Sequence, residues 1–284
     1  MYTYNELYLK TRSVLKQSGI EACDAEARYL LSAASGKSIK DLLRDYSLYS
    51  GPGVEKILVE YIKRRLSGEP VAYITGQWEF YGLPMRITND VLIPRTDTEI
   101  LVDCVKEYLH GRKMDARVLD LCTGSGCIGC AVAHELPATR VVCVDISAAA
   151  LEVCRKNAVL NKLSSRVIAM QADAQSSPPM GIGRFDVIVS NPPYISSSEI
   201  PSLDHSVKDY EPMWALDGGE DGLKFYKSII KYWKSLLTEN GIIVFEVGEG
   251  QAEPVKEMLL MGGFRSVYTR KDTIDVDRAV IGVI

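Results

Sequence analysis

The sequence has no long hydrophobic run. No apolar stretch approaches the roughly 18–20 residues that a membrane span needs, and the segment Met1 to Glu6 has no basic region followed by an apolar core. We therefore expect a cytoplasmic protein that stays out of membranes. With 46% hydrophobic and 25% charged residues, the 284-residue chain has the composition of a folded globular protein, long enough for one large and one smaller domain.

The sequence also lacks an excess of positive charge. Its formal net charge is −4 and its sequence pI is about 5.6, and the basic residues are scattered except at 63–65 and 265–271. Proteins that bind nucleic acid neutralise phosphates mainly with clustered lysine and arginine. The charge pattern therefore predicts no stable nucleic-acid binding. We expect a monomer.

Histidine is scarce, and the seven cysteines form no complete metal set. Cys127 and Cys130 make a Cys-x-x-Cys pair with Cys122 close by, a pattern that zinc and redox sites share. No second such pair follows, and the three histidines stand far apart in the sequence. We expect no metal site, and we expect reduced thiols packed in the core.

The most informative segment is Asn191-Pro192-Pro193-Tyr194, which follows the apolar run 185–190. That run predicts a buried parallel strand, so the four residues emerge at its carboxyl end, where open α/β sheets bind ligands. The two prolines fix φ and remove two backbone donors, which leaves the Asn191 carboxamide and the backbone carbonyls beside an aromatic ring. Asn-Pro also begins ordinary turns, and the segment alone leaves that interpretation open.

A planar NH2 group suits these residues. The lone pair of an amide nitrogen or a base amine is delocalised, so the nitrogen reacts only when fixed oxygens hold its hydrogens and orient it. We predict Asn191 Oδ1 and the Pro192 carbonyl as these acceptors. Tyr194 is predicted to stack on the flat group, for about 0.5–1.5 kcal/mol beyond area burial. The segment does not distinguish an amide substrate from a nucleic-acid base.

Glycine and proline divide the chain into three parts. The sequence pattern predicts a small domain of amphipathic helices in residues 1–72. It predicts a β-hairpin connector in residues 73–93 and a second domain in residues 94–284. The helices of the first part are expected at residues 4–18, 22–35, 39–45 and 54–67. This part carries no catalytic constellation, which leaves a role in docking a partner or a purely structural one.

From Arg117 onward strands alternate with helices, a pattern that makes a parallel sheet. Strands are expected at residues 117–121, 140–145, 166–171, 185–190 and 241–247, followed by a helix at 253–261 and late strands at 264–269 and 278–283. The predicted fold class is therefore α/β, with about seven strands in one Rossmann-like, mostly parallel sheet.

A glycine-rich turn, Cys122-Thr123-Gly124-Ser125-Gly126, connects the first of these strands to a helix. Its glycines let a ligand approach the backbone, and the start of the helix offers unpaired N–H groups. Asp145 ends the next strand and is placed to accept both hydroxyls of a ribose. The third strand ends near Asp173 and Ala174, which we expect beside an adenine amine and ring. Asp173 also fits an ordinary solvated position.

The same turn is compatible with two different cofactors. Gly124, Gly126 and Gly129 satisfy Gly-x-Gly-x-x-Gly, so a nicotinamide dinucleotide is an alternative. Asp120 argues against it, because a carboxylate just before the turn would repel a pyrophosphate and favour a ligand with an amino or cationic group. S-adenosyl-L-methionine has both a sulfonium and an amino group.

Several further segments make the chain resemble the release factor glutamine methyltransferases, the HemK/PrmC group of class I S-adenosylmethionine-dependent enzymes. Besides 120–126 and 189–195, the segments that carry the resemblance are Arg64 to Leu66 (RRL), Gly68 to Gly76 (GEPVAYITG), Glu79 to Leu83 (EFYGL), Leu92 to Glu99 (LIPRTDTE), Glu211-Pro212 and Gly219 to Leu223 (GEDGL). The resemblance covers nearly the whole chain. Asn-Pro-Pro-Tyr is shared by many amino-group methyltransferases, whereas the other segments are more particular.

The resemblance implies methyl transfer from S-adenosyl-L-methionine to the side-chain amide nitrogen of the glutamine in the Gly-Gly-Gln loop of release factors, the proteins of translation termination. It implies that residues 122–126 and Asp145 bind the cofactor, that Asn191 touches both cofactor and substrate, and that residues 191–194 hold the glutamine. It also implies that a helical domain such as residues 1–72 helps to dock the release factor.

Three positions depart from the family pattern. Cys122 stands where Gly is more common, so it needs a φ that a side chain tolerates. Thr96 replaces a Pro, and Ala174 stands where some members carry an aromatic residue beside adenine. Three alternatives to release factor methylation stay open at this point. One is an amino methyltransferase that acts on a nucleic-acid base or another protein's glutamine, and another is an NAD-dependent oxidoreductase. The third is a non-catalytic binding module.

Overall fold

The structure is a computed structural model that describes residues 2–111, 115–272 and 274–284. The chain forms two compact units. The amino-terminal unit comprises residues 1–77 and 205–210, and the sheet unit comprises residues 78–204 and 211–284. Each unit buries apolar side chains in a core of its own.

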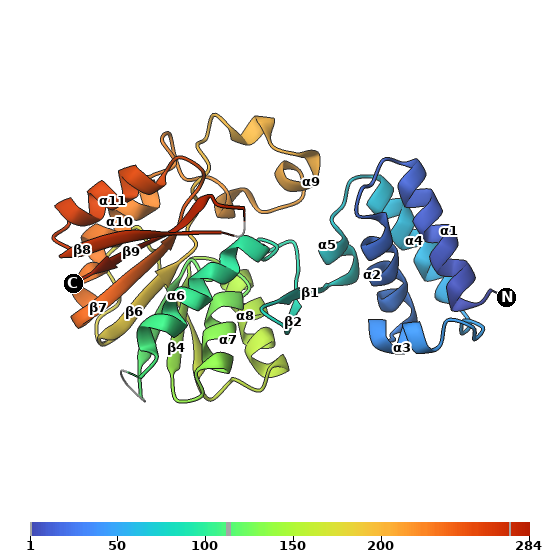
Figure 1. The fold of residues 1–284 in the computed structure, drawn as a ribbon, viewed down its shortest axis with the longest axis horizontal. Coiled ribbons are helices and arrows are strands. Elements are labelled where there is room, and N and C mark those ends of the chain that lie inside the picture. Colours follow the sequence, from blue (N-terminus) through green and yellow to red (C-terminus); the bar gives the residue numbers. More distant parts are fainter. Residues whose placement is uncertain (1, 112–114, 273) are drawn as a thin grey trace. The chain divides into compact units, whose positions relative to one another are not determined.

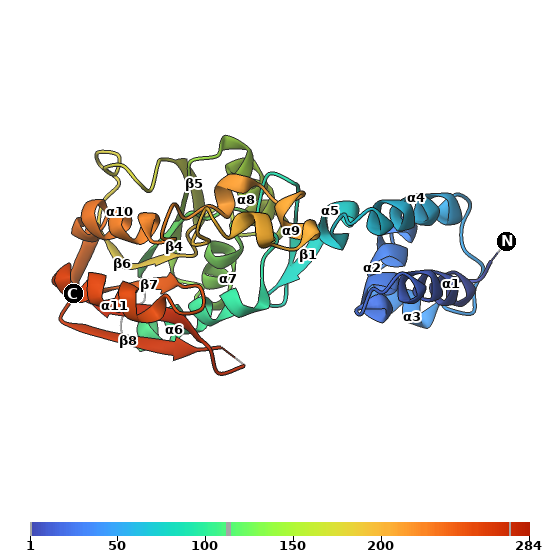
Figure 2. The same cartoon turned by 90° about the horizontal axis from the view of Figure 1, so that it is seen from above.

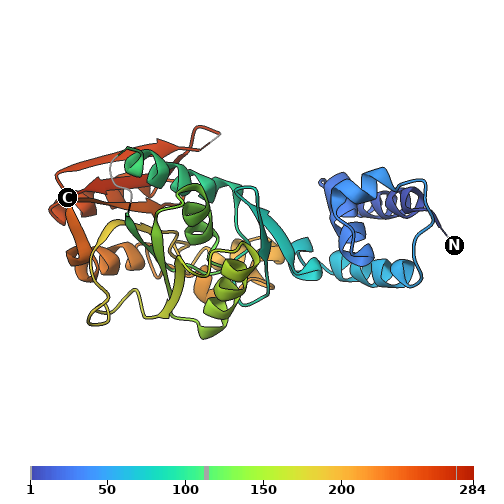
Figure 3. The same ribbon diagram turned by 90° about the horizontal axis from the view of Figure 1, so that it is seen from below.

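Helices build the amino-terminal unit (Figure 3). They are α1 (Tyr4–Gln17), α2 (Cys23–Ser35), α3 (Ile39–Arg44), α4 (Val54–Leu66), α5 (Val71–Thr75) and the short α9 (His205–Lys208). Their apolar faces meet around Leu15, Leu30 and Leu42, whose side chains are almost fully buried. A mostly buried ion pair between Arg65 and Glu26, 2.7 Å apart, joins α4 to α2. The four helices predicted for this part of the chain are confirmed.

The stretch predicted as a hairpin connector begins within a helix instead. α5 ends at Gly76, whose φ of +67° stops the helix. Val71 and Ile74 pack into the core of the amino-terminal unit, and this packing overrides their preference for strands. The hairpin itself is shorter and consists of β1 (Gln77–Phe80) and β2 (Leu83–Arg86).

The sheet unit is built on a sheet that has seven strands within the described ranges, in the order β5-β4-β3-β6-β7-β9-β8. The strands are β3 (Arg117–Leu121), β4 (Arg140–Asp145), β5 (Val167–Gln171), β6 (Phe185–Ser190), β7 (Leu237–Glu246), β8 (Ser266–Lys271) and β9 (Asp277–Val283). β3 to β7 run parallel, and β9 pairs antiparallel with β7 and β8. β5 and β8 form opposite edges (Figure 2). The predicted α/β class is confirmed.

Helices cover both faces of this sheet (Figure 1). One face carries α6 (Glu99–Leu109), α7 (Cys127–Glu135) and α8 (Ala148–Leu160), and the other carries α10 (Lys224–Tyr232) and α11 (Ala252–Met261). Enclosure on both faces explains why β6 reads as a nearly continuous apolar run. Among the helices that the structure describes, none combines the length and the apolar character that a bilayer span requires.

Asn157 of α8 ties the hairpin to the glycine-rich turn. Its side chain is fully buried. Nδ2 donates to the carbonyls of Arg86 at 3.0 Å and Ser125 at 2.9 Å, and Oδ1 accepts from the Arg86 N–H at 2.7 Å. One side chain therefore satisfies three backbone groups, two in β2 and one in the turn.

Asn157→Ala is expected to lower the free energy of unfolding of the sheet unit by about 2–4 kcal/mol, because three buried backbone groups lose their partner. Urea denaturation of the full chain followed by tryptophan fluorescence measures this loss, since all three tryptophans (Trp78, Trp214, Trp233) lie in the sheet unit. Asn161→Ala, at the residue that follows the same helix, is the control. Its Nδ2 donates to the Pro84 carbonyl at the surface and to the Asn157 carbonyl, so its cost should stay below about 1 kcal/mol. Equal losses in the two variants would contradict the role of Asn157.

Candidate active site

The predicted site segments meet where the central parallel strands end. Leu121 at the end of β3 pairs with Val144 of β4 on one side and with Ser190 of β6 on the other. The Ser190 hydroxyl also donates to the Leu121 carbonyl at 2.7 Å. From β3 the chain moves outward to β4 and β5 and then returns to the other side of β3 with β6. This is the switch point of the sheet, where α/β proteins bind ligands.

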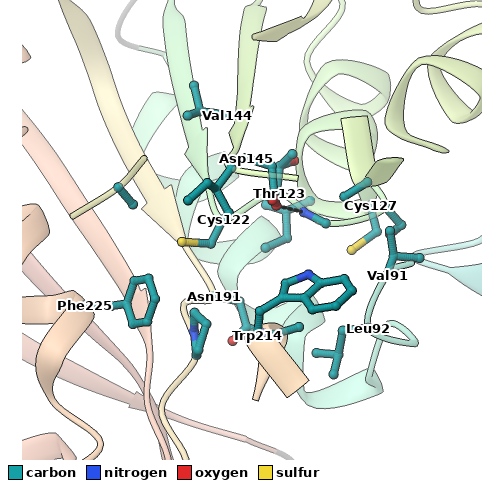
Figure 4. Close-up of a pocket in the computed structure, with 18 of the residues that line it drawn as sticks. Val91, Leu92, Cys122, Thr123, Cys127, Val144, Asp145, Asn191, Trp214 and Phe225 are labelled. Carbon is teal, nitrogen blue, oxygen red and sulfur yellow. Dashed lines mark hydrogen bonds between the residues drawn. The ribbon is translucent and has the colours of Figure 1, made fainter. Parts of the chain in front are cut away.

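A pocket opens at this end of the sheet (Figure 4). It is lined by the turn after β3, the ends of β4 and β5, the segment after β6, residues of the 90–98 segment, and side chains beyond residue 210. The predicted site residues that line it are Cys122, Thr123, Gly124, Ser125, Asp145, Asp173, Ala174, Asn191 and Pro193. The other three predicted residues, Gly126, Pro192 and Tyr194, lie next to the pocket in the chain and do not line it.

The turn after β3 has a left-handed backbone. The φ angle is +58° at Cys122, +52° at Gly124 and +77° at Gly126. A Cβ on Gly124 would have no neighbour within 4 Å, whereas a Cβ on Gly126 would stand 2.5 Å from Cys154 Sγ. Gly124 therefore leaves its backbone open to a ligand in the pocket, and Gly126 lets α7 start close against α8.

Asp120 lies behind this turn and is not among the pocket residues. Its side chain is fully buried, and Oδ2 accepts hydrogen bonds from the Thr123 hydroxyl and from the Gly129 N–H, the latter at 3.0 Å. Burial raises the pKa of Asp120 to about 7, although both hydrogen bonds act in the opposite direction. The expected repulsion of a pyrophosphate by Asp120 therefore has no direct contact to act through. The carboxyl group holds the turn from behind.

Asp145 is fixed on both of its carboxylate oxygens by backbone groups. Oδ2 accepts from the Gly124 N–H and Oδ1 from the Ser147 N–H, each at 2.9 Å. Burial raises the pKa of Asp145, and these backbone hydrogen bonds counteract the increase. Because a carboxylate oxygen has more than one lone pair, each oxygen keeps an acceptor position after these contacts. The side chain can therefore accept further hydrogen bonds on either oxygen.

Asp173 and Ala174 follow β5 at the neighbouring strand end. The Asp173 carboxylate accepts from the Gln175 N–H at 2.8 Å and from the Ser176 hydroxyl at 3.0 Å, so it shapes its own turn while it lines the pocket. The Ala174 side chain is buried, and its carbonyl accepts from Trp233 Nε1 at 3.1 Å. This hydrogen bond anchors the pocket wall to the core beneath α10.

Asn191 presents its carboxamide in a defined direction. Nδ2 donates to Thr98 Oγ1 at 3.2 Å. Thr98 is buried at the end of the 3-10 turn Thr96–Thr98, which leads into α6. Within the described part of the chain, no hydrogen bond to Asn191 Oδ1 occurs. Since Asn191 lines the pocket, its oxygen is the acceptor that remains available there.

Tyr194 is held from the side of the core. Its hydroxyl donates to Glu246 Oε1 at 3.3 Å, and its carbonyl accepts from Gln251 Nε2 at 2.8 Å. The ring packs against the core beneath α10, and burial raises the pKa of the phenol. These contacts account for the position of Tyr194. Its stacking on a substrate stays a prediction.

Known proteins match both units. A family model described as PrmC N-terminal domain matches residues 6–76, and one described as Methyltransferase small domain matches residues 96–204. A release factor glutamine methyltransferase from Clostridium acetobutylicum is 40% identical over 275 residues, which are 97% of this chain and 96% of the relative. Another, from Geobacter sulfurreducens, is 38% identical over 284 residues, 100% of this chain and 98% of the relative.

The chain belongs to the release factor glutamine methyltransferase family. The resemblance predicted from the sequence is thereby confirmed. The methyltransferase domain of the chain is of the class that uses an S-adenosylmethionine-type methyl donor. The fold extends beyond the family, because the hMettl16 catalytic domain, solved with the MAT2A 3′UTR hairpin 6, has a TM-score of 0.59 at 18% identity over 81% of each chain.

The backbone at Cys122 accounts for the expected preference for glycine at this position. Its φ of +58° is the conformation that glycine adopts without strain, and a side chain there costs on the order of 1 kcal/mol. At the other departure in the pocket, Ala174, the side chain is small. Phe225 of α10 lines the same pocket and supplies an aromatic ring from a different element.

Two aromatic pocket residues did not stand out in the sequence. In Figure 4 the Phe225 ring and the Trp214 indole lie on opposite sides of Asn191. Trp214 belongs to the 3-10 turn Met213–Ala215 and is 54% exposed, unusual for tryptophan outside a binding site. Its neighbours Glu211-Pro212 were part of the family resemblance and were the available signal. No sequence signal pointed to Phe225, because it looks like one of the apolar positions of an amphipathic helix.

The segment from Val91 to Arg95, also missed as pocket lining, is fixed by a buried acid. Glu211 accepts from the Ile93 N–H at 3.2 Å and forms an ion pair with Arg95. Its side chain is almost fully buried. The contact joins the segment before α6 to the segment that carries Trp214.

The cysteines behave as core thiols. Six of the seven are buried, Cys122 is partly buried, and all are unpaired. Burial raises the pKa of Cys127 to about 12, so this member of the Cys-x-x-Cys pair is a protonated thiol at neutral pH. Cys127 and Cys122 also line the pocket, where their sulfur atoms add to its apolar wall.

The two glycines of the turn should respond differently to an added methyl group. Gly124→Ala is expected to lower the free energy of unfolding by about 1–2 kcal/mol. This is the cost of the left-handed backbone alone, because the new methyl group meets no neighbour. Gly126→Ala should lose about 2–5 kcal/mol, because the new methyl also meets Cys154. Urea denaturation followed by tryptophan fluorescence measures both. In the Gly126→Ala background, Cys154→Ala should recover part of the loss, and purely additive losses would contradict the clash.

Proposed function

We propose that this protein transfers a methyl group from S-adenosyl-L-methionine to the side-chain amide nitrogen of the glutamine in the Gly-Gly-Gln loop of peptide chain release factors. The observation that carries the proposal is the orientation of Asn191. Its NH2 group is tied to Thr98, and its oxygen remains as an acceptor in the pocket of a methyltransferase domain. An acceptor held in that way suits a substrate that offers N–H groups, and the named function of the relatives selects glutamine.

The pocket residues fit S-adenosyl-L-methionine. The backbone at Gly124 is open, the carboxylate of Asp145 is held for two ribose hydroxyls, and the Ser125 hydroxyl is buried without a hydrogen-bond partner in the described chain. We propose residues 122–126 and Asp145 as the cofactor-binding set, with Asp173 at the adenine amine and Ala174 and Phe225 beside the ring. When bound, the cofactor supplies a methyl group on a positively charged sulfur.

Asn191 and its neighbours are proposed to work by positioning. Asn191 Oδ1 and the Pro192 carbonyl accept the two amide hydrogens, which points the nitrogen lone pair at the methyl group, while Pro193 and Tyr194 complete the glutamine site. The new bond joins nitrogen to the methyl carbon, the carbon–sulfur bond breaks, and its electron pair stays on sulfur. The nitrogen then releases one proton. Orientation of two bound reactants lowers a barrier by about 7–11 kcal/mol, so no base is needed to start the transfer.

The alternatives fit the chain less well. A dehydrogenase has no use for an asparagine acceptor directed at an N–H group, and the matched domain is a methyltransferase domain. An enzyme for nucleic-acid bases needs a basic surface, and the net charge of this chain is −4. We further propose that the helical part, residues 1–72, docks the release factor, that residues 73–93 connect it to the catalytic domain at 94–284, and that the protein acts as a cytoplasmic monomer.

Mass spectrometry of a purified release factor tests the substrate. After incubation with this protein and S-adenosyl-L-methionine, the tryptic peptide that contains the Gly-Gly-Gln loop should gain the mass of one methyl group, with the fragment ions placing it on the glutamine. A release factor in which that glutamine is replaced by asparagine is the control and should gain nothing. Methyl transfer to DNA or RNA in place of the release factor would overturn the proposed substrate.

Asn191→Ala should reduce the rate of methyl transfer at least about 10²-fold, because the amide loses an oriented acceptor. Calorimetry should show that the affinity for S-adenosyl-L-methionine changes by less than roughly tenfold, since residues 122–126 and Asp145 are untouched. Ser198→Ala, an exposed change in the same segment, is the control and should keep the wild-type rate. Near-normal turnover by Asn191→Ala would rule out this role for the residue.

A further inference from the structure

Trp214 is an exposed aromatic residue of the active-site pocket to which the mechanism above gives no role. Among the described residues that line the pocket, two are exposed, Trp214 at 54% and Ile146 at 56%. Ile146 directly follows Asp145 and therefore stands at the proposed cofactor end. A side chain that lines a pocket and is also more than half exposed stands at its rim. Trp214 is therefore a rim residue, although tryptophan is highly buried on average.

The indole lies on the side of Asn191 that is opposite the proposed adenine position. In Figure 4 the Trp214 indole and the Phe225 ring flank Asn191 from opposite sides. The Phe225 ring is proposed to stand beside adenine, and the Asn191 oxygen is proposed to hold the amide of the glutamine. The side of Asn191 that faces away from Phe225 is therefore left for the peptide that carries the glutamine, and Trp214 stands on that side.

The indole N–H of Trp214 is available to a ligand. The other two tryptophans use theirs inside the fold, since Trp78 Nε1 donates to the Pro94 carbonyl at 3.0 Å and Trp233 Nε1 donates to the Ala174 carbonyl at 3.1 Å. Trp214 Nε1 forms no such bond within the part of the chain that the structure describes. Trp214 thus offers a flat apolar face together with one hydrogen-bond donor, a combination that makes tryptophan frequent at protein interfaces.

The chain that leads to Trp214 is anchored to another wall of the pocket. Glu211, three residues before Trp214, is buried and accepts from the Ile93 N–H at 3.2 Å. The 3-10 turn that carries the indole is closed by the Ala215 N–H, which donates to the Pro212 carbonyl at 2.9 Å. The exposed indole therefore projects from a hydrogen-bonded turn with a buried anchor.

The chain after Trp214 pairs with the residue that directly follows Tyr194. The Ile195 N–H donates to the Leu216 carbonyl at 3.1 Å, and the Gly218 N–H donates to the Ile195 carbonyl at 2.8 Å. A Cβ on Gly218 would stand 2.8 Å from Tyr194 Cα, so the two segments pass in direct contact. The backbone that carries the indole is therefore fixed relative to the segment that ends at Tyr194, which reduces the ordering needed when a substrate binds.

A flat ring at this part of the rim favours a residue without a side chain next to the bound glutamine. Peptide N–H groups make favourable contacts with the face of an aromatic ring. Glycine lets the backbone reach that face because it has no Cβ, whereas a larger residue would hold the backbone away from the ring or displace the ring. The loop proposed as the substrate has two glycines directly before its glutamine.

We propose that Trp214 is a specificity-determining residue whose indole packs on the peptide backbone beside the substrate glutamine and selects glycine at the position before it. This inference rests on the proposed function, because the Gly-Gly-Gln loop is the ligand that it places on the indole. Trp214 binds the substrate in this arrangement and takes no part in the transfer of the methyl group. Its effect is expected in KM for the release factor and in the choice of the neighbouring residue, and not in the affinity for the methyl donor.

The first experiment measures methyl transfer to a release factor by the full-length protein. Trp214→Ala should raise KM for the release factor at least about tenfold, as the loss of a central aromatic contact does. The calorimetric affinity for S-adenosyl-L-methionine should stay within about threefold of wild type. Trp214→Phe keeps a flat ring and should hold KM within about fivefold of wild type. Met213→Ala is the matched control, because Met213 is 49% exposed in the same 3-10 turn but does not line the pocket, and it should keep the wild-type KM.

The second experiment uses a release factor in which the glycine before the loop glutamine is replaced by alanine. For the wild-type protein, kcat/KM with this substrate should be lower than with the glycine form by on the order of 30-fold, because the added methyl group meets the indole. Trp214→Ala makes room for that methyl group and should raise the ratio of the alanine to the glycine value at least about fivefold. A ratio that Trp214→Ala does not raise, zero included, overturns the inference.

Two further results of the first experiment would also overturn the inference. One is a KM for the release factor that Trp214→Ala leaves unchanged. The other is a greater loss of affinity for S-adenosyl-L-methionine than for the release factor, because Trp214 would then belong to the cofactor site. The wild-type arm tests the proposed function, since a wild-type protein that does not methylate the release factor overturns that function and the inference with it. With an active wild type, each of the other results overturns the inference alone.

Discussion

The site depends on the register of β3 between β4 and β6. Pairing of Leu121 with Val144 and with Ser190 ends the three strands at one level, so that the glycine-rich turn, Asp145 and Asn191 begin side by side. A shift of one residue in either pairing would turn the following side chains to the opposite face of the sheet. Apolar side chains on both faces of these strands, fully buried under α7 and against α10, make such a shift costly. The packing of the core therefore sets the geometry of the pocket.

Two buried acids hold the backbone segments that form the site. One holds the glycine-rich turn, and the other holds the segment that follows β6. Asp120 holds the glycine-rich turn through Thr123 and Gly129, and Glu246 accepts the hydroxyl of Tyr194 at the end of the Asn191 to Tyr194 segment. In both cases burial raises the pKa to about 7, so each acid carries an electrostatic cost. The same burial orders the loops, because a deeply buried acceptor holds its hydrogen-bond donors in a fixed direction.

Such rigidity suits a reaction between a weak nucleophile and an activated donor. An amide nitrogen gains little from a base before attack but much from alignment with the methyl carbon. Three features restrict the orientation of groups in the pocket and move no protons. They are the prolines after Asn191, the hydrogen bonds that hold Tyr194 and the fixed carboxylate of Asp145. The aromatic side chains of Phe225 and Trp214 add walls on either side of Asn191. The side chains of the pocket are therefore held in fixed orientations.

The sequence by itself determined the fold class, the family and the segments of the site, because these follow from local patterns: strand-length apolar runs, a glycine-rich turn, and motifs such as Asn191 to Tyr194. Only the tertiary structure decided that Asp120 faces inward, that Val71 to Thr75 is helical, and that Phe225 lines the pocket. Only the tertiary structure also joined Thr98 to Asn191, which lie 93 residues apart in the chain. The physical reason is common to all of them. A side chain's direction and partners depend on burial and register between distant segments, which no local pattern records.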